Sequence, residues 1–201
     1  MPAQHESKTK LLDAALRVIR TKGYEATTVD EVCESAGLTK GSFFHHFESK
    51  EDLAIAAAKH FARMADGVFS DAPYRKLADP VDRLLGYVDF RRAILNLELP
   101  EFTCLLGTMV QETYATHPSI RKACDRYIGE HAATLIADIA EAKRRHAPRA
   151  RWTPESLALF TQAAIQGAFV LAKAQHGPRI ADGCLAHLRR YLELLFDRPK
   201  E

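Results

Sequence analysis

Residues 27–47 read TTVDEVCESAGLTKGSFFHHF, and this stretch decides the fold of the amino-terminal part of the chain. A capping-box pattern begins at Thr28, and Thr39 has the form of a second helix start. Gly37 lies between them, where a tight turn requires a residue that tolerates a positive φ. The stretch therefore predicts two short helices joined by a tight turn.

The second of these helices is expected to have an inward and an outward face. Phe43 and Phe47 are four residues apart, so they share one face and should pack into the core. The outward face suits the major groove of DNA, whose width accepts an α-helix. Phosphates are favoured at helix amino termini, where Thr28 and Lys50 lie. The predicted DNA-binding residues are Thr28, Thr39, Lys40, Gly41, Ser42, Phe44, His45, His46 and Lys50.

The sequence from Leu11 to Leu53 resembles the DNA-binding domain of the tetracycline repressor (TetR) family, and GLTKGSFFHHF (37–47) and SKEDL (49–53) carry the resemblance. It implies a small helix-turn-helix domain, residues 1–50, and a larger ligand-binding and dimerisation domain, residues 51–201. It also implies a homodimer that binds a palindromic double-stranded DNA operator and is released by a small-molecule effector. The family usually has tyrosine where Phe44 stands, so its phosphate contact is missing and His45 or His46 is a candidate replacement.

The rest of the chain also shows helical spacing, and no sustained strand pattern interrupts it. Asp79-Pro80 and Thr153-Pro154 each pair a capping residue with proline at the first helical position, which predicts helix starts there. Breaks are expected near residues 72–73, 98–100, 117–118 and 176–178. The sequence therefore predicts an all-α fold of about nine helices.

The last two helices are candidates for the dimer interface. Residues 153–175 are apolar or small around nearly the whole circumference, which predicts a helix buried between two layers. Leu185, Leu188, Leu192 and Leu195 then form a stripe that requires a partner helix. The family resemblance implies that both helices pair with their copies in a second chain. The alternative is that the same stripes close the core of one chain.

An effector site is expected in the larger domain. Its aromatic residues could line an apolar cavity that holds a few polar groups, a mixture typical of ligand pockets. The candidates are Tyr87, Phe90, Phe102, Met109, Tyr114, Tyr127, Phe160 and Phe169, with the polar His131, Gln166 and Lys173. From these we select Phe90, Tyr127, His131, Phe169 and Lys173 as ligand-binding residues, together with Cys104.

Cys104 begins a segment, CLLGTMVQE (104–112), that resembles the C-x-x-G-x-x-x-x-E segment of a TetR subgroup. Some members of that subgroup sense electrophiles or oxidants through this cysteine. A thiol becomes reactive near a cation or a helix amino terminus, and Lys173 is a candidate cationic neighbour. The alternative is that Cys104 is a small buried residue at a close helix crossing with Gly107.

Composition bears on how the chain could bind DNA, on its localisation and on whether it holds disulfides or metals. The net charge is +2, and residues 1–50 contain seven basic and seven acidic residues, so attraction to DNA must come from where the charges lie. Without a signal sequence or 18 consecutive apolar residues, we expect a cytoplasmic protein away from the membrane. The four scattered cysteines predict reduced thiols, and adjacent His45 and His46 make a poor metal pair. No cofactor is expected.

Two other functional classes remain possible from the residues alone. An enzyme could use Cys104 as nucleophile and His131 as base, but no third group is evident to orient them, and no catalytic motif appears. A helical ligand carrier that binds no DNA would fit the neutral charge of residues 1–50. The resemblance favours a transcription regulator over both.

Overall fold

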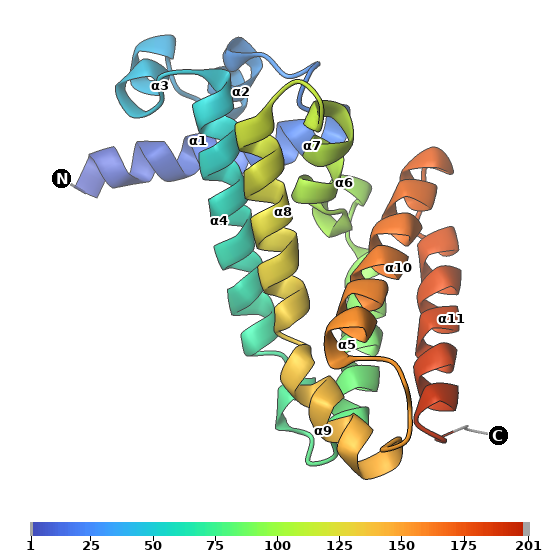
Figure 1. The fold of residues 1–201 in the computed structure, drawn as a ribbon. Coiled ribbons are helices and arrows are strands. Elements are labelled where there is room, and N and C mark those ends of the chain that lie inside the picture. Colours follow the sequence, from blue (N-terminus) through green and yellow to red (C-terminus); the bar gives the residue numbers. More distant parts are fainter. Residues whose placement is uncertain (1, 199–201) are drawn as a thin grey trace. The chain divides into compact units, whose positions relative to one another are not determined.

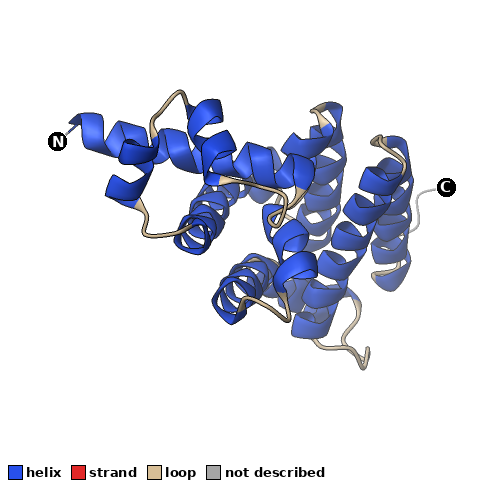
Figure 2. Cartoon of the chain, turned by 90° about the horizontal axis from the view of Figure 1, so that it is seen from above, coloured by secondary structure: helices blue, strands red, loops and turns tan. Residues whose placement is uncertain are grey.

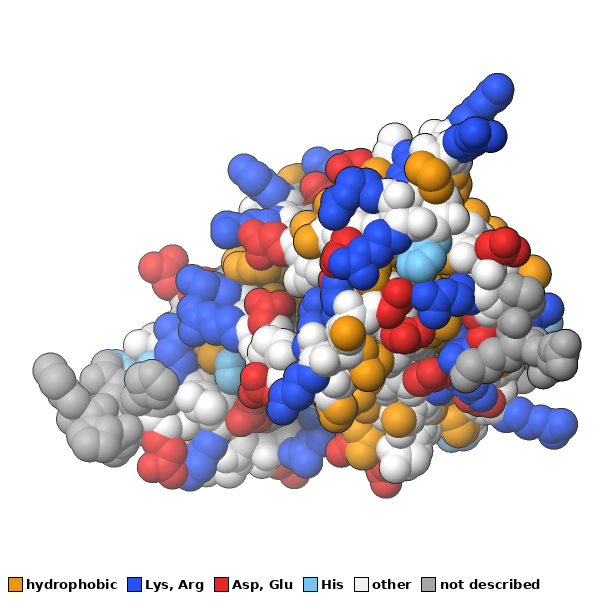
Figure 3. Space-filling view, turned by 90° about the horizontal axis from the view of Figure 1, so that it is seen from below, with side chains coloured by type: hydrophobic (Ala, Val, Ile, Leu, Met, Phe, Trp, Pro, Cys, Tyr) orange, Lys and Arg blue, Asp and Glu red, His pale blue; other side chains and the backbone are white. Residues whose placement is uncertain are grey.

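The computed structural model describes residues 2–198, and side chains from Glu6 onward. Within these residues the chain forms eleven α-helices and two 3-10 helices, and no strand occurs there (Figures 1 and 2). The expected all-α fold is confirmed. Acidic and basic side chains are interspersed over the face drawn in Figure 3, as the small net charge suggests.

The helices divide between two compact units. The first unit extends to Ala65 and also includes Thr103–Tyr127, and the second comprises Asp66–Phe102 and the residues from Ile128 onward. This division follows packing, so it differs from the division by role at residue 50, which stays a prediction. The first unit contains α1 (Pro2–Lys22), α2 (Val29–Ala36), α3 (Lys40–His46), most of α4 (Lys50–Ser70), α7 (Leu105–Thr113) and much of α8 (Pro118–Ala133).

The second unit contains the remaining helices. They are η1 (Pro73–Lys76), α5 (Pro80–Ala93), η2 (Ile94–Asn96), α6 (Leu99–Phe102), the end of α8, α9 (Ile136–His146), α10 (Pro154–Ala174) and α11 (Arg179–Leu195). Within this unit α10 packs against α9 and α11, and α5 packs against α9 and α11.

Local capping determines where several helices begin, as the sequence predicts. The hydroxyl of Thr28 accepts a hydrogen bond from the Glu31 amide in a complete capping box. Thr153 caps α10 through a capping box with Ser156, and the Asp79 carboxylate caps α5 by accepting from the Val81 amide; proline follows each of them. These contacts satisfy amides that have no partner within the first helical turn.

Two helix boundaries were not predicted. The segment expected as one helix after residue 100 is divided into α6 and α7, and the segment after residue 118 is divided into α8 and α9. At the second break, Thr134 and Leu135 donate their amides three residues back, to His131 and Ala132, in a tightened turn. Neither glycine nor proline marks this turn, so the sequence carries no signal for it.

Within a single chain, α10 is buried on one side only. Ala158, Ile165, Phe169 and Ala172 are buried on one side, but Phe160 and other large apolar residues of the helix are exposed. On α11, by contrast, Leu185, Leu188 and Leu192 are buried within their own chain. The single chain therefore covers the leucine stripe of α11 and leaves one face of α10 uncovered.

Helix α10 is also long and apolar enough, by length and composition alone, to cross a membrane. A helix in the core of a globular protein passes the same test, and 44% of its most apolar window is buried inside the protein. This is weak evidence for a membrane span.

Candidate functional site

Helix α3 has the two faces that its sequence predicts. Phe43 is fully buried and Phe47 is 2% exposed, so both pack inward as expected. The ring of Phe44 is 60% exposed, and the side chain of Thr39 caps the helix by accepting a hydrogen bond from the Ser42 amide. Also exposed are Thr28, Thr39, Lys40, Gly41 and His45, while Ser42 is half-buried.

The charge on this face is carried by Lys40. Its Nζ lies 2.8 Å from Oδ1 of Asp30 on α2, and hydrogen bonding to this carboxylate raises the pKa of the Lys40 ammonium. Both side chains are exposed to solvent. Because exposed ion pairs contribute little to stability, Lys40 can exchange Asp30 for another anion at small cost.

His46 faces the protein instead of the outer surface. Its Nε2 lies 2.7 Å from the hydroxyl of Ser7 on α1. Burial lowers the pKa of the His46 imidazole, and the neighbouring charges of His45 and Lys8 lower it further. Its ring is thus engaged with α1, and its contact with DNA stays a prediction.

Lys50 makes contacts within the chain that were not predicted. Its ammonium donates to the backbone carbonyls of Tyr24, Glu25 and Thr27 at 3.2, 3.4 and 3.1 Å. It also lies 4.3 Å from the centroid of the Tyr24 ring. These contacts use all three donors of the ammonium. Lys50 thus fastens the loop between α1 and α2, and its expected phosphate contact stays a prediction.

Helix α7 also contacts the loop between α1 and α2. An Oε atom of Glu112 accepts a hydrogen bond from the Glu25 amide at 2.9 Å. The ring of Tyr24 also meets His117 edge-on, with centroids 5.2 Å apart. The sequence places Glu112 in a motif but does not indicate a partner for it. The structure shows that it positions the loop that leads into the helix-turn-helix.

Cys104 lies at the amino terminus of the same helix α7, directly before Leu105. It is half-buried, and all four cysteines of the chain are free thiols. Cys124 is buried beside it: burial, and to a lesser extent Cys104, raise the pKa of the Cys124 thiol to about 12. Lys173 belongs to the other unit, so the expected pairing of Cys104 with Lys173 stays a prediction.

A polar cluster lies inside the second unit, around Tyr87 and His131. The Tyr87 hydroxyl accepts from Nε and Nη2 of Arg91 at 3.1 and 3.0 Å and from Nε2 of Gln162 at 2.9 Å. Nε2 of His131 lies 2.7 Å from Nη2 of Arg91. Burial, together with the charges of Arg91 and Arg75, lowers the pKa of His131 to about 3. The imidazole is therefore neutral.

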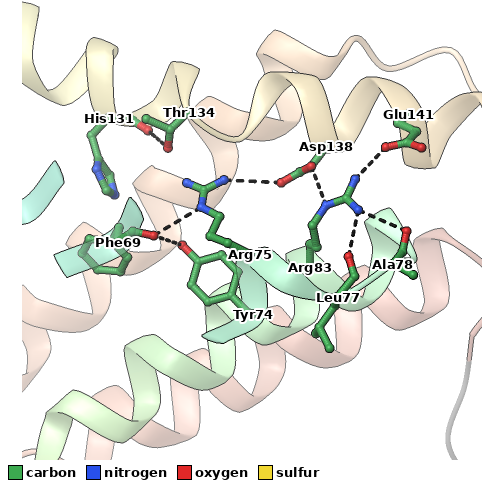
Figure 4. Close-up of polar contacts among 10 residues, drawn as sticks. All are labelled: Phe69, Tyr74, Arg75, Leu77, Ala78, Arg83, His131, Thr134, Asp138 and Glu141. Carbon is green, nitrogen blue, oxygen red and sulfur yellow. Dashed lines mark hydrogen bonds and ion pairs between the residues drawn. The ribbon is translucent and has the colours of Figure 1, made fainter. Parts of the chain in front are cut away.

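Next to this cluster, a network of ion pairs joins α9 to η1 and α5 (Figure 4). Nε of Arg83 lies 2.7 Å from Asp138, and its Nη2 lies 2.6 Å from Glu141. Arg75 donates to the Phe69 carbonyl at 3.2 Å and reaches Asp138 at 3.5 Å. Both arginines of the network therefore have a carboxylate partner.

The structure brings some of the predicted ligand-binding residues together. Phe90 and His131 both contact the ring of Phe69, at centroid distances of 5.3 and 5.0 Å. Phe169 instead packs against Phe102 at 6.0 Å. Lys173 is half-buried, and Tyr127 is half-buried in the first unit.

Arg91, Gln162 and Phe69 belong to the polar cluster but were not predicted. The one available signal was the position of Arg91, which lies one helical turn after Tyr87 on α5. In the described part of the chain, no group of three or more His, Cys, Asp or Glu side chains is placed to hold a metal.

Comparison with known proteins decides the family. Residues 11–57 match the model of bacterial regulatory proteins of the tetR family. Residues 80–180, half of the chain, match the model of the C-terminal domain of LmrA/YxaF-like transcriptional regulators. The chain belongs to the TetR family. It is therefore a DNA-binding transcription regulator and not an enzyme, as the sequence predicted.

The named relatives are also transcription regulators. The chain is 28% identical over 172 residues to the transcriptional regulator AcuR of Cereibacter sphaeroides. This match covers 84% of this chain and 77% of AcuR. It is 32% identical over 143 residues to the repressor AcnR of Corynebacterium diphtheriae, covering 70% of this chain and 65% of AcnR. A shorter match, 34% identical over 61 residues, covers 30% of this chain and 21% of the regulator YerO of Bacillus subtilis.

Solved TetR-family structures have the same fold. A TetR transcriptional regulator from Chloroflexus aurantiacus superimposes with a TM-score of 0.83 at 25% identity, over 96% of each chain. The subgroup resemblance at Cys104 is a finer statement than the family and stays a prediction.

Proposed function

We propose that this TetR-family regulator is a cytoplasmic repressor that binds a palindromic operator as a homodimer and leaves it when a small-molecule effector binds. The observation that carries the proposal is the outward face of α3, where Phe44 is 60% exposed while Phe43 is fully buried. A large exposed aromatic ring beside exposed hydrogen-bond donors is typical of a surface that binds a partner.

The proposed DNA contacts come from α3 and from two helix starts. Lys40, Ser42, Phe44 and His45 face the major groove, and Thr28 and Thr39 face phosphates. Gly41 supports this assignment because it lies exposed in a helix and has an ordinary φ. A Cβ added there would meet only the Thr39 hydroxyl at 3.7 Å. Since the fold does not require glycine there, close approach of the DNA backbone is its proposed reason.

The proposed dimer forms through α10 and α11. Large apolar side chains remain exposed along both helices, and Phe160 and Tyr191 touch across them with centroids 5.1 Å apart. This set consists of Leu159, Phe160, Val170, Leu171, Tyr191 and Leu194. It replaces the leucine stripe of α11 as the proposed contact, because that stripe is already covered within the chain.

The centre of this apolar face is made of small residues. Ala163 and Gly167 lie one turn apart on α10, and a Cβ added to Gly167 would have open space around it. A second helix can approach closely there, as small residues permit at helix interfaces. A two-fold dimer then presents two copies of α3 to half-sites about 34 Å apart.

Effector binding is proposed for the larger domain, with Phe90, His131 and Phe169 among the contacts. Electrophiles are an alternative to a reversibly bound effector in the larger domain, and Cys104 is the residue that would attack them. Cys104 is only half-buried and lies directly before α7, which supports this role. Glu112 at the far end of α7 would pass a displacement to the loop before the helix-turn-helix.

The test is a mobility-shift titration with the DNA that flanks the gene. We expect specific binding that weakens steeply with salt, because each phosphate contact releases counterions. Lys40→Ala should weaken operator binding about tenfold or more. Lys59→Ala, which removes an exposed lysine of α4, is the matched control and should bind like the unmodified protein. Absent or salt-insensitive binding, or equal affinities for both variants, would contradict the proposal.

A further inference from the structure

Arg91 differs from its neighbours because no carboxylate neutralises it within the described residues. Arg92, the next residue on α5, pairs with Asp182 at 2.7 Å, and Arg189 pairs with Asp89 at 2.8 Å. Arg91 has only neutral partners, the Tyr87 hydroxyl and the His131 ring. A half-buried cation without a counter-charge is costly, so its surroundings favour an anion.

The cluster also contains more hydrogen-bond donors than acceptors. A guanidinium only donates, so Nε2 of His131 accepts from Arg91 and the ring proton of neutral His131 lies on Nδ1. This Nδ1 atom is buried and has no hydrogen-bond partner within the described residues. The Tyr87 hydroxyl already accepts from both Arg91 and Gln162. Buried donors without partners are rare in proteins, so oxygen acceptors are missing here.

The walls of the cluster are aromatic. The guanidinium carbon of Arg91 lies 4.1 Å from the centroid of the Phe69 ring, and Phe69 in turn contacts Phe90 at 5.3 Å. Tyr74 meets Phe90 at 6.0 Å and Tyr87 at 5.9 Å. Such walls are suited to an apolar body attached to the anionic group, because pockets for small molecules combine apolar walls with a few placed polar groups.

We infer that the effector of this regulator carries a carboxylate on an apolar body, and that Arg91 binds the carboxylate with help from His131. Nε and Nη2 of Arg91 bond to Tyr87 and His131, so the donors for a carboxylate come from Nη1, which has no hydrogen-bond partner within the described residues. The Nδ1 proton of His131 supplies another donor from α8. This inference rests on the proposed function, since it specifies the chemical class of the proposed effector.

The neighbouring arginines show why Arg91 is the residue that binds the anion. Arg75 and Arg83 are occupied by Asp138 and Glu141, as Figure 4 shows. An anion placed at either arginine would have to displace a carboxylate of the protein. At Arg91 it would replace no charge at all, and it would supply the acceptor oxygens that the cluster lacks.

The test compares matched carboxylates and amides by isothermal titration calorimetry on the full chain. The probes are benzoate against benzamide and octanoate against octanamide, with sulfate as an anion without an apolar body. We expect the protein to bind a carboxylate about tenfold or more tightly than its amide, because hydrogen bonds to a charged group are the stronger ones. Equal binding of each pair, no binding of either carboxylate, or binding of sulfate as tightly as the carboxylates would overturn the inference.

Two variants test whether Arg91 is the residue that binds the carboxylate. Arg91→Gln should weaken carboxylate binding about 10- to 100-fold and leave amide binding nearly unchanged. The matched control is Arg92→Gln, one position further on the same helix, which removes an arginine already paired with Asp182 and should bind carboxylates normally. Carboxylate binding that survives in Arg91→Gln would overturn the assignment. If Arg91→Gln does not fold, the comparison of carboxylates with amides on the unmodified protein still decides the chemical class.

Failure of this inference is distinct from failure of the proposed function. If the ligand-free protein binds its operator but shows no preference for carboxylates, the effector class is wrong and the regulator remains. If the ligand-free protein does not bind DNA, the proposed function fails whatever the calorimetry shows.

Discussion

The carboxylate of Glu112 accepts a hydrogen bond from the backbone amide of Glu25, with 2.9 Å between the two atoms. The same carboxylate lies against Gly23, so close that a Cβ added to Gly23 would lie 2.2 Å from its Oε1. Lys50 binds carbonyls of the same loop. Helices α4 and α7 thus hold the loop that connects α1 to the helix-turn-helix.

Gly23→Ala should destabilise the protein more than an ordinary glycine substitution. Gly23 has a φ of +91, where an alanine is strained by about 1–3 kcal/mol, and its Cβ would also displace the Glu112 carboxylate. Gly67→Ala is the control, since Gly67 lies in α4 with open space around it, and alanine there should stabilise the helix. Urea denaturation measures both. Equal stabilities of the two variants would contradict the account of this loop.

The partner variant Glu112→Ala separates the two causes. It removes the collision with the Cβ but leaves the strained φ, so Gly23→Ala should cost less in a chain that already carries Glu112→Ala. A cost that is unchanged by the second substitution would show that the carboxylate does not crowd Gly23.

Substitutions of Lys50 and of Lys40 should have opposite effects on the stability of the protein, although both residues were predicted to contact DNA. Lys50→Met removes three hydrogen bonds to loop carbonyls, so it should lower the free energy of unfolding by about 1–3 kcal/mol. Lys40→Ala removes an exposed pair with Asp30 and should leave stability nearly unchanged while it weakens operator binding. Thermal unfolding and mobility shifts on both variants check this. If Lys50→Met is as stable as the unmodified protein, Lys50 does not fasten the loop, and its predicted phosphate contact is favoured instead.

These two lysines show what the sequence could and could not predict. The positions of α2 and α3 followed from Thr28, Gly37 and Thr39, whose contacts lie within a few residues. The contacts of Lys50 lie 23 to 26 residues away, and the Ser7 partner of His46 lies 39 residues away. Such contacts depend on how helices pack, and sequence spacing alone does not reveal them.

The polar cluster around Tyr87 and His131 could likewise be predicted only in part from the sequence. Phe90 and His131 were predicted from residue type, because a few polar groups among aromatics are typical of a pocket. Arg91 was missed because its importance comes from what it lacks, a carboxylate partner, and that becomes visible only when its neighbours are placed. The face of α10 that its own chain leaves uncovered could not be predicted, because the sequence shows which residues are apolar but not which of them their own chain covers.

The exposed face of α10 should control assembly. Leu171→Glu places a carboxylate on the proposed two-fold interface. There it would lie near the same carboxylate of the second chain and would be removed from solvent. We expect monomers in analytical ultracentrifugation and a loss of operator affinity. Leu77→Glu is the control, since Leu77 is 43% exposed against 44% for Leu171 but lies outside α10 and α11. If Leu171→Glu stays dimeric, or if both variants become monomeric, this surface is not the interface.

His131 should make stability fall in mild acid. Its pKa is about 3 in the folded chain against 6.5 when exposed, because burial and the charges of Arg91 and Arg75 oppose protonation. Between these values the unfolded chain binds a proton that the folded chain does not. The free energy of unfolding should therefore decrease as the pH falls below 6.5, by up to about 1.4 kcal/mol per pH unit from this residue.

The check is urea denaturation of the unmodified protein and His131→Gln, which keeps an acceptor for Arg91. The stability difference between them should change by about 2 kcal/mol from about pH 7.5 to about pH 5, with the unmodified protein losing more. Arg91→Gln should reduce this acid sensitivity, because removing the neighbouring positive charge lets the pKa of His131 rise toward 6.5. Parallel pH profiles for the unmodified protein and His131→Gln would mean that His131 is protonated as readily in the folded chain as in the unfolded one.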